Sequence, residues 1–135
     1  MGQQQLLLLT LAAILVGIGV LLGINMFQEN AAQANLDAVI QRSLSLGSQA
    51  QAWYKRPAAM GGGGQSFIGF TLADLGYAAA GDTTEDGIFT ATVLGSNSIM
   101  ITGVGKEDLG GADTDPLEVD VTVSSNSAAV SEVRK

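Results

Sequence analysis

The feature that most constrains this chain is its N-terminal stretch, which carries no charged side chain over residues 1–28. Within it, residues 6–27 are apolar except for Thr10 and Asn25. At about 1.5 Å rise per helical residue this run is roughly 33 Å long, close to the ~30 Å hydrocarbon core of a bilayer. An apolar environment offers the backbone no other hydrogen-bond partners, so we expect a helix. Such a helix either spans a membrane or is buried among copies of itself.

The helix is expected to continue well beyond the apolar run, because residues 28–56 contain no proline and a single glycine. Apolar side chains recur there mainly at spacings of three or four, which predicts an amphipathic helix with one buried stripe. The stripe consists of Ala32, Leu36, Val39, Ile40, Leu44, Leu46, Ala50 and Trp53. Lys55 and Arg56 suit a helix C-terminus, and Pro57 forbids further continuation. We therefore expect one helix over residues 1–56, apolar over 1–28 and amphipathic over 29–56.

The rest of the chain divides into a connection and a strand-rich part. Residues 57–86 form a Gly-rich connection, with a short extended piece at 66–71 and then a loop or a single helical turn. In residues 87–135, Phe89, Ala91 and Val93 alternate with threonines, which predicts a half-buried strand. A turn at 95–97 leads into a second strand at 98–104, so we expect a hairpin. Alternation over 117–124 predicts a third strand, and residues 128–133 a fourth.

These elements predict the fold class. Three or four antiparallel strands with one apolar face need a cover, and the apolar stripe of the helix is long enough to supply it. We therefore expect an α+β fold, in which the amphipathic half of a long N-terminal helix packs on a small antiparallel β-sheet headpiece.

Composition excludes several classes of function. The chain has neither His nor Cys, which removes thiol catalysis, Cys/His zinc sites and histidine acid–base chemistry. No nucleophile motif is present either, so we expect neither an enzyme nor a bound cofactor. A net charge of −7 makes nucleic acid an unexpected partner, because binding phosphates requires a basic surface.

Three loop features allow other readings. The glycines at 61–64 suggest a phosphate loop, but the lysine that such a loop requires is replaced by Gln65-Ser66, so we expect a flexible or tightly packed loop. Carboxylates in two loops offer oxygen ligands for Ca²⁺, although neither loop fits the EF-hand pattern and solvated acidic loops are the simpler reading. The two groups are Glu107, Asp108, Asp113 and Asp115, and Asp82, Glu85 and Asp86. Trp53 and Tyr54 are expected in the core or at its edge.

Taken together, the chain resembles a mature type IV pilin or a related pseudopilin. The resemblance is carried by the charge-free start (MGQQQLLLLTLAAILVGIGVLLGI), the amphipathic continuation that ends near residue 55, and the small sheet-rich C-terminal part. It implies that a prepilin peptidase removes a basic leader, which makes Met1 the new N-terminal residue and the site of N-methylation. A second register, with cleavage after Gly2, would place Gln3 first.

The resemblance also implies a function. The chain would be a structural subunit of an extracellular type IV pilus-like filament, held in the inner membrane before the assembly machinery polymerises identical copies. The apolar helix would pack in the filament core through Met1, Gln5, Leu6, Leu9, Ala13, Val16, Gly17, Val20, Gly23 and Phe27. The alternatives are a pseudopilin of a type II secretion-like system and an exported domain with a single-span membrane anchor.

Two positions depart from the pilin pattern. Pilins usually carry Glu as the fifth mature residue, where it offsets a neighbour's N-terminal amine, whereas this chain has Gln5. Many pilins also have a Pro near position 22, where the helix loosens in the filament. Here Gly17, Gly19 and Gly23 occupy that region, and each Gly weakens a helix by about 1 kcal/mol relative to Ala. We expect any loosening in the filament to fall between Gly17 and Asn25.

Overall fold

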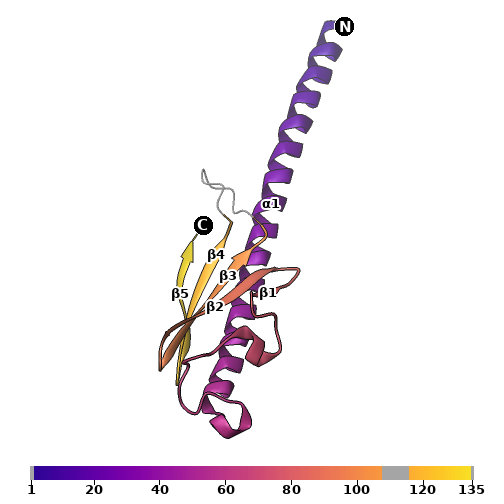
Figure 1. The fold of residues 1–135 in the computed structure, drawn as a ribbon. Coiled ribbons are helices and arrows are strands. Elements are labelled where there is room, and N and C mark those ends of the chain that lie inside the picture. Colours follow the sequence, from indigo (N-terminus) through magenta and orange to yellow (C-terminus); the bar gives the residue numbers. More distant parts are fainter. Residues whose placement is uncertain (1, 108–115, 135) are drawn as a thin grey trace.

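A computed structural model describes residues 2–107 and 116–134 of the chain. A single long helix leads into a small sheet that lies along its C-terminal half (Figure 1). The elements in chain order are helix α1 (Gly2–Lys55), two 3₁₀ turns η1 (Ala58–Met60) and η2 (Leu72–Leu75), and strands β1 (Asp82–Thr83), β2 (Gly87–Gly95), β3 (Ser98–Gly105), β4 (Glu118–Ser124) and β5 (Ala128–Arg134). The predicted α+β fold is confirmed.

Helix α1 is continuous over its whole described length of 54 residues. At about 1.5 Å per residue it is roughly 80 Å long, far longer than an ordinary globular helix. It remains helical through Gly17, Gly19 and Gly23 in the single chain. Loosening of this segment concerns the assembled filament and stays a prediction.

The sheet is an antiparallel meander in the order β1-β2-β3-β4-β5. The predicted hairpin is confirmed: β2 and β3 pair from Gly87↔Gly105 to Gly95↔Ser98 across the turn at residues 96–97. Strand β4 continues the ladder, and β5 forms the far edge. Along each strand, successive side chains point to opposite faces of the sheet, and the pairing register places the buried apolar residues of β2, β3 and β4 on one face.

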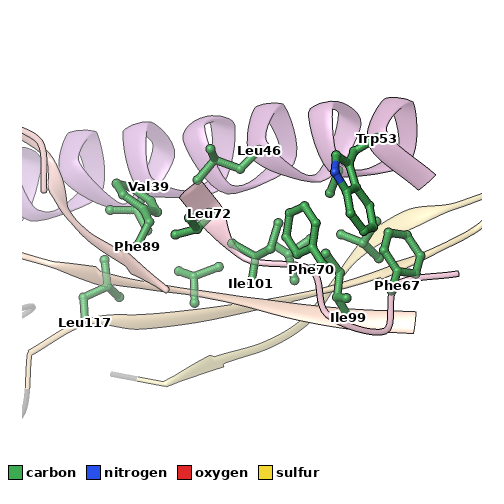
Figure 2. Close-up of a cluster of buried hydrophobic side chains, with 14 residues drawn as sticks. Val39, Leu46, Trp53, Phe67, Phe70, Leu72, Phe89, Ile99, Ile101 and Leu117 are labelled. Carbon is green, nitrogen blue, oxygen red and sulfur yellow. The ribbon is translucent and has the colours of Figure 1, made fainter. Parts of the chain in front are cut away.

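The core lies between the inner face of this sheet and the second half of α1 (Figure 2). Val39, Leu46 and Trp53 project from the helix at intervals of seven, so they form one stripe. Ile99, Ile101, Phe89 and the inward valines of β4 meet them from the sheet, while Phe67, Phe70 and Leu72 close the core from the connection.

Two glycines set the spacing between helix and sheet. A Cβ on Gly103 would lie 2.8 Å from Ser43 Oγ and 2.8 Å from Val39 Cγ1. A Cβ on Gly47 would lie 2.9 Å from Val123 Cγ2. Ser43 and Gly47 are therefore buried at the centre of the helix face. The apolar pattern missed both, because their small size and not their hydrophobicity places them there.

Some expectations about the strands were wrong in detail. Residues 66–71, expected to be extended, are interrupted by a turn at residues 68–69, which brings the rings of Phe67 and Phe70 into the core. Val93, expected to be buried with Phe89, stays 36% exposed near the end of β2. The sheet has five strands and not three or four, because Asp82–Thr83 of the expected connection pairs with Ile88 and Phe89.

Candidate assembly surface

The first half of α1 stands clear of the sheet (Figure 1). Its large apolar side chains are exposed. Their exposed fractions range from 50% at Ile18 to 79% at Phe27. This is the one helix among the described residues that is long and apolar enough to cross a membrane, and its apolar window is 0% buried. A fully buried Leu or Ile contributes roughly 1.5–3 kcal/mol relative to exposure, so leaving this half in water would cost tens of kcal/mol. It therefore requires a membrane or a protein cover.

The predicted core-packing residues share one side of this helix. Gln5, Leu9, Val16, Val20 and Phe27 follow one another at helical spacings of four and seven. Leu6, Ala13, Gly17 and Gly23 flank them, and Met1 lies outside the described residues. The other sides are equally apolar and exposed, through Leu7, Leu8, Leu15 and Leu21. The geometry therefore makes every side of the apolar half available for packing and does not single out the predicted one.

The glycines of this half leave room for close contact. A Cβ added to Gly17, Gly19 or Gly23 would meet no other atom within 4 Å. Small residues allow the backbones of two packed helices to approach closely in apolar surroundings. These positions are thus open to a neighbouring helix, and none of the described residues occupies them.

The second half of α1 is fastened to the surrounding headpiece by side-chain contacts as well as by the core. Arg42 Nη2 donates to Asp82 Oδ2 at 2.8 Å, and the Arg42 guanidinium lies 5.3 Å from the centre of the Tyr77 ring. The hydrogen bond with Asp82 raises the pKa of Arg42, and Tyr77 adds to the effect. Gln51 Nε2 donates to the Ser124 carbonyl on the opposite flank, at 3.0 Å. Apolar half and headpiece are therefore linked through one uninterrupted, anchored helix.

The alternative loop sites receive little support from the geometry. Around the glycines at 61–64, backbone N–H groups of Gly63 and Gly64 donate to the carbonyls of Trp53 and Arg56. These N–H groups cap the C-terminal end of α1, so they are not free to bind a phosphate. Residues 61–64 therefore form a tightly packed loop. Trp53 is buried, packs edge-on against Phe70 and belongs to the core, as predicted.

The structure describes some of the proposed calcium ligands and not others. Asp108, Asp113 and Asp115 lie outside the described residues. In the second group, Asp82 is engaged by Arg42. Within the described ranges no three metal-binding side chains come together.

One polar network escaped the sequence analysis. On the outer sheet face, Asp120 is 4% exposed and accepts hydrogen bonds from Thr102 Oγ1 at 2.7 Å and Arg134 Nη2 at 2.7 Å. Glu118 and Glu132 also pair with Arg134, and their charges raise its pKa. Strict alternation assigns Asp120 to the polar face, so the pattern gave no indication that it would be buried. The network fastens edge strand β5 to β4.

Comparison with models of known protein families gives no match, and searches of curated proteins and of solved structures give none either.

Proposed function

We propose that this chain is a structural subunit that polymerises through the apolar half of α1 into an extracellular type IV pilus-like filament. The observation that carries the proposal is the exposed apolar half, continuous with a helix that is anchored in the headpiece core. A protein that needs only a membrane anchor can join its membrane segment to the exported domain through a flexible linker. An unbroken helix instead fixes the orientation of the headpiece relative to the apolar half, as a regular polymer requires.

The driving force follows from the exposed surface. The membrane covers the apolar half before assembly, and other copies cover it afterwards. The open glycines permit close packing of helices. A staggered contact between identical copies that does not close into a ring extends into a helical fibre. The headpiece then forms the outer layer, with its polar face toward water.

The N-terminal amine poses a specific question in this arrangement. If Met1 is the mature terminus, its ammonium lies in an apolar core beside Gln5, which can accept a hydrogen bond but cannot neutralise the charge. An unpaired charge in such surroundings is costly. Gln5 therefore cannot offset the charge of the amine as a carboxylate would. A structure of the filament would identify the group that does.

Substitution of Val16 tests the proposal. Val16 is 66% exposed in the middle of the apolar half and contacts no part of the headpiece core. Val16→Asp places a charge in the filament core, so we expect it to abolish surface filaments while the headpiece remains folded. The matched control, Val16→Leu, keeps the site apolar and should assemble. Filaments of normal abundance built from Val16→Asp would refute core packing.

The same experiment separates the alternatives. A pseudopilin would be recovered with the inner membrane and would give no long filaments from either variant. A plain anchor would tolerate Val16→Leu and remain in the membrane without ever appearing in sheared cell-surface material.

A further inference from the structure

The headpiece carries negative charge at its end nearest the apolar half. There Asn35 of α1 contacts two loops: its Nδ2 donates to the Asp86 carbonyl at 2.8 Å, and its Oδ1 accepts from the Glu107 backbone N–H at 3.5 Å. These contacts hold the backbone of Asp86 and Glu107 at one level of the helix. We call these two residues and the neighbouring Glu85 the proximal rim. The side chains of Glu85 and Glu107 are exposed. Among the described cations, Lys106 is next to Glu107 in the sequence, and Arg134 at the same end of the sheet is paired with Glu118, Asp120 and Glu132.

The opposite end of the headpiece carries positive charge. Lys55 and Arg56 lie where α1 ends, and the connection folds around them (Figure 1). Both are exposed, and neither forms an ion pair with any residue in the described part of the chain. No acidic residue occurs from 55 to 70 or in the turns at 95–98 and 124–127.

The most exposed large apolar side chains of the described headpiece lie at this same end. Met60 is 74% exposed, Ile68 71% and Leu94 55%. Met60 belongs to the short turn that follows Lys55 and Arg56. The segment before Ile68 is tied to the β2–β3 turn, because the Phe67 N–H donates to the Ser96 carbonyl at 2.8 Å. Leu94 is the bulged residue of β2 just before that turn. With the two cations, these side chains form what we call the distal face.

The distal face and the proximal rim are far apart within one chain. Between Asn35 and Lys55 the helix rises about 30 Å at ~1.5 Å per residue. Opposite charges at that separation are screened from one another at physiological salt, where the Debye length is about 8 Å. Each set of charges is therefore available to a different molecule.

We propose that the distal face of one copy docks on the proximal rim of the next copy along the filament. The inference rests on the proposed function and deepens it by naming the contact between headpieces. Lys55 and Arg56 would face Glu85 and Glu107, and Met60 would exclude water beside them. The contact joins unlike surfaces, so it does not close on itself and repeats along a fibre. Burial of the apolar helix drives assembly, and the charges set the axial offset of neighbouring copies at about the 30 Å that separates the two ends.

Zero-length cross-linking tests this contact directly. Carbodiimide joins an amine to a carboxylate only when they touch, and within one chain Lys55 and the proximal rim are about 30 Å apart along the helix. Any amide between Lys55 and Glu85 or Glu107 must therefore join two copies. We expect such peptides from wild-type filaments and none from detergent-dispersed subunits. Wild-type filaments in which Lys55 gives no link to either residue would overturn the inference.

A charge swap supplies the second test. Lys55→Gln with Arg56→Gln should lower filament recovery about two- to tenfold, the effect of losing one or two exposed ion pairs per contact. The control, Thr90→Glu with Ser45→Glu, makes the same change in net charge at exposed sites midway between the two ends of the headpiece and should leave recovery within about twofold of wild type. Lys55→Glu with Arg56→Glu should weaken assembly further, and adding Glu85→Lys with Glu107→Lys should restore it.

The outcomes distinguish the two proposals. Restoration by the fourfold swap supports the contact, whereas wild-type filaments without restoration refute it and leave the filament function standing. If the wild-type chain forms no filaments at all, the proposed function fails and the contact fails with it.

Discussion

Replacing Gly103 by alanine tests the account of how the helix seats on the sheet. The new Cβ would lie 2.8 Å from Ser43 Oγ, 2.8 Å from Val39 Cγ1 and 2.9 Å from Phe89 Cε1. Carbon contacts are favourable at about 3.5–4.0 Å, so the added methyl is too close by roughly 0.6 Å or more to two carbons. Ser43 and Val39 have short side chains on a helix held by the rest of the core, so relief requires α1 to move. Overpacking of this kind costs about 1–3 kcal/mol.

The free energy of unfolding is measured by thermal melts of the full-length chain in mild detergent, followed through the near-ultraviolet signal of Trp53. A loss of 1 kcal/mol lowers the melting temperature of a domain this size by about 4–8 °C. The matched control is Gly95→Ala, because a Cβ there would meet only Ser98 Oγ, at 4.0 Å. Gly103→Ala melting within about 2 °C of the control would refute the close-approach argument.

Three further substitutions probe the loops and the sheet edge. Arg42→Gln should lower the free energy of unfolding by about 0.5–1 kcal/mol, because its ion pair with Asp82 is partly exposed. It should also speed amide exchange around residues 77–83. Unchanged exchange would show that Arg42 does not hold this segment in place. Asn35→Ala removes two hydrogen bonds to loops and should cost about 1–2 kcal/mol, read by denaturant titration against the exposed neighbour substitution Ala34→Ser. Arg134→Gln leaves the buried Asp120 carboxylate with Thr102 as its remaining side-chain partner, so the backbone amides of β5 should exchange faster. The control is Glu132→Gln, which keeps the pair between Arg134 and Asp120. Equal exchange rates in the two variants would show that Arg134 does not fasten β5.

The sequence predicted the large elements because each has a strong period. The long helix follows from an unbroken run without proline and a stripe at spacings of three and four, and the hairpin follows from alternation on either side of a turn. Both patterns depend on residues that are close together in the sequence, so they can be recognised without knowing the tertiary structure.

What the sequence did not predict depends on contacts between distant residues. Strand β1 is two residues long, too short to show alternation, and exists because Asp82 is held by Arg42 and pairs with Phe89. Ser43 lies at the helix–sheet contact because Gly103 stands opposite it. Burial of Asp120 depends on Arg134 reaching across from β5. In the first half of α1, the exposed apolar residues follow directly from the sequence, but a uniformly apolar helix contains no pattern that identifies a contacting side. The side that packs in a filament stays a prediction.

Imaging of sheared cell-surface material by electron cryomicroscopy tests the central claim most directly. Our account predicts long filaments of this one chain, with the apolar halves of α1 packed along the axis and the headpieces outside. The same map would show whether the helix loosens between Gly17 and Asn25 and what faces Gln5. Recovery of the chain solely from the membrane, or filaments in which the apolar halves lie apart from one another, would contradict it.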